Sequence, residues 1–265
     1  MRVIDLTEEL TPLYLVCLED WSDEPREAGD ARERWFRRAR DQGLRVKLAL
    51  DDDGRAAGMI QYLPIEHAPA LGQGLYFILC IWVHGHRSGR GNFQGRGMGS
   101  ALLRAAEEDA RALGAKGMAA WGLALPVWMR ASWFRRHGYR RADRQGLSAL
   151  VWKPFSPEAE PPRWPPATGK RPDPLPGKVV VTACTTGWCM GMNLGIERAR
   201  EAARRSGDRA EFRLVDTGER QALLAWGRSE ALWVDGREVR NGPPPSQARL
   251  VRLVRRRVAR LRAGA

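Results

Sequence analysis

A proline-rich segment at residues 153–177 constrains the fold of this 265-residue chain more than any other feature. It reads KPFSPEAEPPRWPPATGKRPDPLPG and holds nine of the seventeen prolines, with neither strand alternation nor helical periodicity. Proline fixes φ and lacks a backbone donor, so the segment favours an extended polyproline conformation. The sequence therefore predicts two domains, at 1–153 and 178–265, joined by a linker at 154–177.

Composition allows both domains to build a packed core, because 43% of the residues are apolar. No stretch approaches the roughly 20 apolar residues that cross a bilayer, and the first residues lack a signal-peptide pattern. We therefore predict a cytoplasmic protein without membrane contact. The formal charge of +13 suits nucleic acid, an anionic cofactor or merely an arginine-rich proteome. Net charge alone does not separate these three.

The region before the linker has the pattern of a mixed α/β domain. Its expected helices are at residues 31–42, 99–113 and about 127–137. Strand-like apolar runs occur at 44–50, 57–63, 75–83, 117–121 and 148–153.

The region after the linker predicts a smaller α/β domain of order βαβαββα. Strands are expected at 178–183 and 211–216, with a hairpin of 231–234 and 238–239 through Asp235-Gly236. Helices are expected at 190–206, 221–226 and the C-terminal end.

The most specific local pattern is QGRGMGS at residues 94–100, which follows a strand and opens a helix. Glycines let the backbone approach a ligand, and free N–H groups at a helix N-terminus hold an anion such as a pyrophosphate. The same pattern also serves plain strand-to-helix connections. It is not a nucleotide-binding P-loop, because no Lys-Ser or Lys-Thr follows, and it lacks the surroundings of a dinucleotide fingerprint.

Gln94, Gly97 and Gly99 match the Q/R-x-x-G-x-G/A motif, and with residues 81–83 before it and ASWFRRHGY at 131–139 the chain resembles the GNAT superfamily of N-acetyltransferases. The resemblance covers about residues 44–153. It implies a V-shaped mixed sheet whose splayed central strands admit acetyl-CoA. Backbone groups of Val83 would lie beside the thioester. Amides on the pyrophosphate would come from Gln94, Gly95, Arg96, Gly97, Met98, Gly99 and Ser100.

The implied reaction is attack of an amine, or less readily a thiol, of a small-molecule acceptor on the thioester, which needs a base and a proton for the thiolate. Glu66, at the end of a strand run, and His84, just past the central strand, are the candidate bases because either could reach a central cleft, although most single carboxylates and histidines are not catalytic. Many GNAT enzymes place a tyrosine where this chain has Phe134, which has no proton to donate. A cysteine, a histidine or water must then substitute, or the reaction is not ordinary acetyl transfer.

Several further side chains have two readings each. For the long basic stretch at 84–93, one interpretation is contact with substrate or with the coenzyme phosphates, and the other is a solvated loop. Cys17 and Cys80 are expected as small buried hydrophobes, with Cys80 as the one to watch, because it shares a strand with Val83 near the expected thioester. Four tryptophans line an acceptor pocket or belong to the core: Trp82, Trp121, Trp128 and Trp133.

Cys184 and Cys189 follow an apolar strand and precede a helix, where the helix dipole is expected to lower the pKa of a thiol. Four residues separate them, instead of the two in the thioredoxin motif. A redox disulfide, a soft-metal site and a sulfur-carrying thiol therefore all stay open. Element order and residues 232–239 resemble thioredoxin and glutaredoxin relatives, although the proline those folds need near Glu230 is absent. The combination of domains resembles YoaP-like acetyltransferases.

The C-terminal helix begins at a plausible N-cap, Ser246, and repeats Leu250, Val254, Val258 and Leu261 on one face. We expect this face to dock on the small sheet and the arginines to face water, so nucleic-acid binding is the weaker interpretation. The leading hypothesis is an acetyl-CoA-dependent N-acyltransferase. The alternatives are a coenzyme A-binding sensor that uses the two cysteines for redox, metal or sulfur chemistry, and a nucleic-acid-associated protein. A homodimer is left open, and no metal is assigned.

Overall fold

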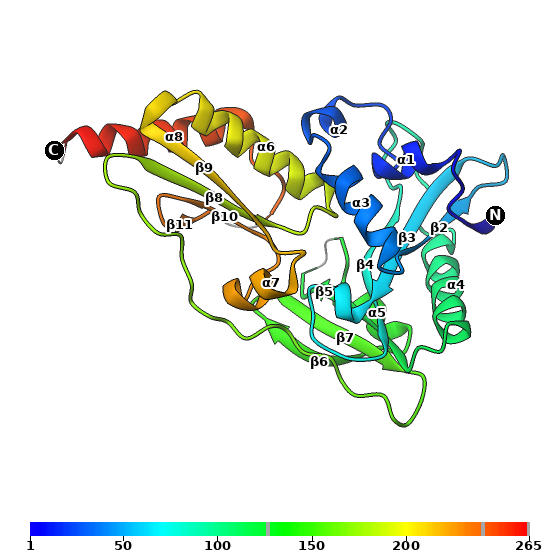
Figure 1. The fold of residues 1–265 in the computed structure, drawn as a ribbon. Helices are drawn as coiled ribbons and strands as arrows, with labels where there is room; N and C mark the ends of the chain where they lie inside the picture. Colours follow the sequence, from blue (N-terminus) through cyan, green and yellow to red (C-terminus); the bar gives the residue numbers. More distant parts are fainter. Residues whose placement is uncertain (126–127, 240–241, 264–265) are drawn as a thin grey trace. The chain divides into compact units, whose positions relative to one another are not determined.

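The computed structural model describes residues 1–125, 128–239 and 242–263 (Figure 1). The chain forms two compact units. The first unit comprises residues 1–21 and 36–164, and the second comprises residues 22–35 and 165–265. Among the described residues, no helix has both the length and the apolar character needed to cross a membrane.

A mixed seven-stranded sheet forms the first unit, in the order β1-β2-β3-β4-β5-β7-β6. All neighbouring strands are antiparallel except β4 and β5, which are parallel. This confirms the predicted mixed α/β fold. The strands are β1 (Arg2–Asp5), β2 (Arg45–Leu50), β3 (Ala56–Pro64), β4 (Leu75–Val83), β5 (Gly117–Leu123), β6 (Arg140–Gln145) and β7 (Ser148–Pro154).

The parallel pair at the centre of this sheet separates along its length. Pairing runs from Leu75 opposite Gly117 to Ile78 opposite Ala120, whereas β4 continues to Val83 and β5 to Leu123. The carboxyl ends of the two strands are therefore not joined by a hydrogen-bond ladder. This is the splayed sheet that the sequence resemblance implied.

Helix α4 (Met98–Ala112) packs its apolar side against strands β2, β3 and β4. Asp109 anchors it, because this carboxylate accepts hydrogen bonds from Arg45 at 2.9 and 2.8 Å and from the Tyr62 hydroxyl at 2.6 Å. Burial raises the pKa of Asp109, but the hydrogen bonds from Arg45 and Tyr62 outweigh it, so the net shift is downward. Asp109 therefore stays ionised and fixes α4 on the sheet.

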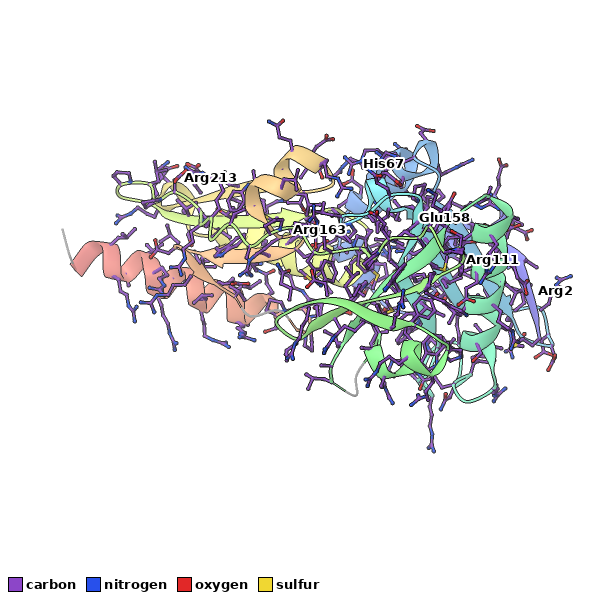
Figure 2. The ribbon with its side chains drawn as sticks, turned by 90° about the horizontal axis from the view of Figure 1, so that it is seen from below. Arg2, His67, Arg111, Glu158, Arg163 and Arg213 are labelled. Atoms are coloured by element: carbon purple, nitrogen blue, oxygen red, sulfur yellow. The ribbon has the colours of Figure 1, made fainter. Side chains whose placement is uncertain are left out.

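Three shorter helical segments and part of the proline-rich segment complete the first unit. The helices are α1 (Thr11–Leu15), α5 (Ala131–Arg136) and the 3-10 turn η1 (Ile65–His67). Arg163, labelled in Figure 2, pairs with Leu71 through two backbone hydrogen bonds of 2.8 and 2.9 Å. Helix α3 (Ala31–Asp41) belongs to both units, which divide between Trp35 and Phe36.

The second unit has a four-stranded sheet in the order β11-β10-β8-β9, with β8 and β9 parallel and the other pairs antiparallel. Leu250 and Val254 of α8 are buried in its core, which confirms the predicted docking face of the C-terminal helix. Strands are β8 (Val179–Thr185), β9 (Ala210–Asp216), β10 (Ala231–Val234) and β11 (Arg237–Glu238). Helices are α2 (Glu24–Glu27), α6 (Met190–Arg204), α7 (Arg220–Trp226) and α8 (Gln247–Ala263), with the 3-10 turn η2 (Gly207–Arg209).

Residues 22–35 join the second unit although they precede most of the first unit in sequence. Arg198 of α6 donates hydrogen bonds to Glu27 at 2.9 and 2.7 Å and to Glu24 at 3.3 Å. The side chain of Arg198 is 13% exposed, so these ion pairs are partly shielded from water. Residues 22–35, expected from sequence within the first domain, are thus tied to α6 by charge pairs between segments distant in sequence.

Candidate active site

The glycine turn before α4 combines unusual backbone conformation with free space. Gly95 and Gly97 have φ values of +77° and +82°, and a Cβ added at either position would meet no atom within 4 Å. Only glycine adopts such φ values readily. Gly97 is the N-cap of α4, so the first amides of this 15-residue helix lie beside the turn. The turn therefore offers unhindered N–H donors of the kind that bind phosphate groups.

Ser100, in the first turn of α4, is linked to His137 after α5. The Nδ1 atom of His137 lies 2.9 Å from the carbonyl oxygen of Trp133, so it must be the donor there. In neutral imidazole, Nε2 then accepts from the Ser100 hydroxyl at 2.9 Å. Trp133 lies beside the first turn of α4, because a Cβ on Gly99 would lie 3.4 Å from its ring. Helix α5 thus forms one side of the candidate phosphate site.

On the edge of β4 that faces β5, the backbone groups of Leu79 and Ile81 form hydrogen bonds with side chains. The indole Nε1 of Trp121 donates to the carbonyl of Leu79 at 2.7 Å, and that of Trp128 donates to the carbonyl of Ile81 at 3.2 Å. The Ile81 amide donates to the Met129 sulfur at 3.4 Å. Side chains from β5 and the segment after it thus replace the missing strand ladder.

Val83 closes β4 next to the glycine turn. No described residue accepts a hydrogen bond from its amide, whereas its carbonyl accepts from the Gln94 side chain at 3.4 Å. A Cβ on Gly85 would lie 2.2 Å from the Gln94 amide nitrogen, so glycine at this position makes room for that side chain. The structure therefore brings Val83 and Gln94 together at the start of the glycine turn.

The two candidate bases lie in different places. His84 directly follows β4, is fully buried, and its Nδ1 contacts the carbonyl of Gly91. Its Nε2 has no hydrogen-bond partner among the described residues. Glu66 lies in η1 and accepts from the Gly74 amide at 2.8 Å, at the opposite end of β4. The structure therefore places His84 beside Val83 at the carboxyl end of β4, whereas Glu66 lies at the other end of the strand.

Residues 4–139 match the family model for the acetyltransferase (GNAT) family. The chain belongs to this family. The match confirms the predicted enzyme class, an acyl-CoA N-acyltransferase. A search of curated proteins finds no match.

Solved structures of GNAT proteins are similar to this chain at low identity. An acetyltransferase of Brucella melitensis in complex with acetyl-CoA is 18% identical over 60% of this chain and 90% of its own, with a TM-score of 0.39. YhbS of Escherichia coli in complex with CoA is 16% identical over 58% of this chain and 81% of its own, with a TM-score of 0.41. An aminoglycoside 6'-acetyltransferase type Ii is 16% identical over 60% of this chain and 99% of its own, with a TM-score of 0.42.

The position where many GNAT enzymes have a tyrosine holds Phe134, whose side chain is fully buried. Tyr139 packs against it with ring centroids 5.4 Å apart, and burial raises the pKa of the Tyr139 hydroxyl well above its usual value. Neither ring supplies a proton readily near neutral pH.

The long stretch after His84 is ordered by Arg90, which pairs with Asp20 at 2.6 Å and contacts the carbonyl of Ala56 at 3.2 Å. Gly89, Arg90 and Phe93 of this stretch line a pocket of about 380 Å³ together with Trp21.

The cysteines of the second unit differ from the sequence-based interpretation. Cys184 is fully buried, and burial, followed by the nearby Glu230, raises the pKa of its thiol to about 12. The expected lowering by a helix dipole is therefore wrong for Cys184, which lies on β8 and not at the helix end. Cys189 is the N-cap of α6. Within the described residues no cysteine forms a disulfide, and no group of three potential ligands could hold a metal ion.

The N-terminus of α6 is covered by other parts of its own unit. Gly187 has a φ of +89°, and a Cβ there would lie 3.1 Å from the carbonyl oxygen of Ala31 and 3.2 Å from Cβ of Trp35. Asn193 donates a 2.8 Å hydrogen bond to the Gly187 carbonyl. Residues 31–35 thus lie against the cysteine loop and leave little space beside it.

Sequence reasoning missed the pair of Ser100 and His137 and the capping roles of Trp121, Trp128 and Met129. His137 lies inside the segment that resembles the GNAT family, but sequence alone does not show which atom it contacts. The tryptophans were noted only as pocket or core residues. Their indole donors matter because β4 and β5 separate, and no pattern along the chain measures that separation.

Proposed function

We propose that the first unit transfers an acetyl group from acetyl-CoA to the amine of a small-molecule acceptor. The observation that carries this is the adjacency of two sets of unhindered backbone donors, at the glycine turn and at Val83. The space around Gly95 and Gly97 fits a pyrophosphate, whose charge the α4 amides would neutralise.

Acetyl-CoA supplies the thioester that the amine attacks. The amides of residues 97–100 would hold the phosphates, and the Val83 amide would donate to the thioester oxygen, where negative charge develops. His84 follows Val83 directly, and its unpartnered Nε2 is the candidate acceptor for the amine proton. Phe134 donates no proton, so the departing thiolate must take one from water or from the acceptor.

Titration calorimetry with acetyl-CoA tests this proposal. The variant Gly97→Trp should lose binding, because its side chain fills the space beside the α4 amides. Gly114→Trp is a matched control, since Gly114 also has a positive φ, +79°, and open space, but lies at the other end of α4. If wild type and Gly114→Trp bind acetyl-CoA and Gly97→Trp does not, the site is supported. Equal binding by all three proteins would place the coenzyme elsewhere.

A second candidate function, a coenzyme A-binding sensor, is favoured by one observation, the phenylalanine at the position of the usual acid. Such a protein would bind acetyl-CoA without releasing free coenzyme A when amines are added. A thiol-release assay with a panel of primary amines separates the two functions.

We infer that the second unit is thioredoxin-like. Its strand order, with β8 parallel to the edge strand β9 on one side and antiparallel to β10 on the other, supports this. Glu230, whose carboxylate accepts from the Thr186 hydroxyl at 2.9 Å, lies at the position where such folds have a proline. Redox, metal or sulfur chemistry of Cys184 and Cys189 stays a prediction, and so do the cytoplasmic location, the absence of nucleic-acid binding and the homodimer.

A further inference from the structure

We propose that Trp128 and Met129 form a plug that closes the edge of β4 in the resting protein, and that the amide-bearing arm of an acyl-CoA displaces this plug when it binds. The inference rests on the proposed function and adds a conformational step to it.

The edge of β4 beyond Ile78 has the properties of a docking strand. The His84 amide donates to Ala57 of β3, so by alternation the backbone groups of Leu79, Ile81 and Val83 point to the other side. No strand pairs with this side after Ile78 among the described residues. Unpaired backbone groups along a strand are a template for any extended chain that carries amides. The arm of coenzyme A is such a chain.

The plug occupies the groups that this chain would need. Trp128 donates to the Ile81 carbonyl at 3.2 Å, and Met129 accepts from the Ile81 amide at 3.4 Å. Trp121 and Trp128 also contact each other edge to face, with ring centroids 5.2 Å apart. Val83, one step further along β4, is the first position whose amide no described side chain occupies.

The plug is held in a conformation that favours exchange. Met129 has a φ of +54°, a region that residues with a side chain rarely adopt. Its sulfur is a weak acceptor, so the Ile81 amide would gain by pairing with an amide oxygen. Trp128 is 37% exposed, so it leaves the edge without disturbing the core.

A backbone anchor keeps the plug close to the edge. The Leu123 amide donates to the Met129 carbonyl at 2.7 Å. A Cβ on Gly122 would lie 2.8 Å from backbone atoms of Ala131, so only glycine allows this close approach to β5. The segment is thus attached to β5 by its backbone, while the side chains of Trp128 and Met129 reach β4. Displacement requires the loss of two hydrogen bonds to Ile81 and of the ring contact between Trp121 and Trp128. It also moves the Met129 side chain, which is 5% exposed, out of the core.

The test compares Trp128→Phe with Trp164→Phe. Phenylalanine removes an indole donor in both variants, but the Nε1 of Trp164 has no hydrogen-bond partner among the described residues, so Trp164→Phe serves as the matched control. Losing one hydrogen bond that competes with the coenzyme should lower the Kd of acetyl-CoA by about three- to tenfold in Trp128→Phe. The Trp164→Phe variant should bind like wild type.

A second ligand locates the effect. Adenosine 3',5'-bisphosphate carries phosphates without the amide-bearing arm, so its Kd should be the same in wild type and Trp128→Phe. An unchanged or raised Kd for acetyl-CoA in Trp128→Phe would overturn the plug while leaving the proposed function intact. An equal gain for both ligands would also overturn it. If neither wild type nor Trp128→Phe binds acetyl-CoA, the proposed function fails and the plug fails with it.

Discussion

The two units each contain a 15-residue helix preceded by a glycine of positive φ, Gly97 at the N-cap of α4 and Gly187 two residues before the N-cap of α6. The two helix ends have different surroundings. At α4 the added Cβ of Gly97 meets nothing within 4 Å, whereas at α6 the added Cβ of Gly187 meets Ala31 and Trp35. Both ends offer amide donors and the same dipole. The comparison teaches that a helix N-terminus is open to a ligand only where the rest of the chain leaves it uncovered.

The most sensitive test of this difference is to add a side chain at Gly97 and at Gly187. Gly187→Val should destabilise the second unit by about 3 kcal/mol, because strain at positive φ adds to a clash with backbone and core atoms. Gly97→Val should cost only about 1 kcal/mol, since the strain is the same but the space is free. Urea unfolding of both variants measures the two costs. Equal losses of stability would mean that the α6 end is not covered.

The pH dependence of stability tests the loop before α6, where Glu230 accepts a hydrogen bond from Thr186. Burial raises the pKa of this carboxyl to about 7, although hydrogen bonds from Thr186 act in the opposite direction. The unfolded chain loses this proton at lower pH than the folded chain. The protonated carboxyl therefore adds its full share to the free energy of unfolding below the unfolded pKa, and this share is lost as pH rises to about 7. We expect the second unit to lose about 2 kcal/mol across that range. In Glu230→Gln this part of the pH dependence should vanish; if the slope persists, another group causes it.

Removing the ion pairs that hold residues 22–35 should uncover the second helix end in part. Arg198→Ala deletes the contacts with Glu24 and Glu27. We expect alkylation of Cys184 and Cys189 to accelerate about fivefold, because the free energy needed to move residues 22–35 away falls by about 1 kcal/mol. Arg204→Ala is the control, because among the described residues Arg204 pairs only with Glu201 of the same helix, and its side chain is largely exposed. Mass spectrometry of alkylated peptides measures both rates. Equal rates in the two variants would show that the ion pairs do not hold the cover.

The smallest expected effect concerns the uncovered end. Ser100→Ala should raise the Kd of acetyl-CoA about threefold, because one hydroxyl near the α4 amides is lost, and Ser100→Thr should restore binding. Calorimetry of the three proteins gives the values. An unchanged Kd in Ser100→Ala would mean that this hydroxyl serves only His137.

Much of the architecture could be predicted because its cause lies in local sequence. The strand expected at 75–83 is β4, and the helix expected at 99–113 is α4 within one residue. Apolar periodicity specifies both elements. The Asp235-Gly236 turn has φ values of +53° and +69°, as a tight hairpin requires. The helix expected from about 127 begins at Ala131, and residue 127 lies outside the described residues.

Other elements depend on distant partners and could not be predicted. Strand β6, RRADRQ, contains no strongly apolar residue, and its strand conformation comes from pairing with β7. The assignment of residues 22–35 depends on Arg198, which lies 171 residues after Glu27. The candidate site also has one part that local sequence predicts and another that depends on distant partners. A glycine motif predicts the candidate phosphate turn, but the caps on Leu79 and Ile81 depend on where two strands separate.

The position of residues 22–35 has a consequence for how the chain reaches its native state. This segment leaves the ribosome early, yet Arg198 and the Gly187 loop that it contacts are synthesised more than 150 residues later. Closing so long a connection is slow compared with local folding. The second unit therefore completes last, and a fragment that starts at the proline-rich segment would expose its cysteine loop. Any attempt to express the halves separately has to supply the early segment as well.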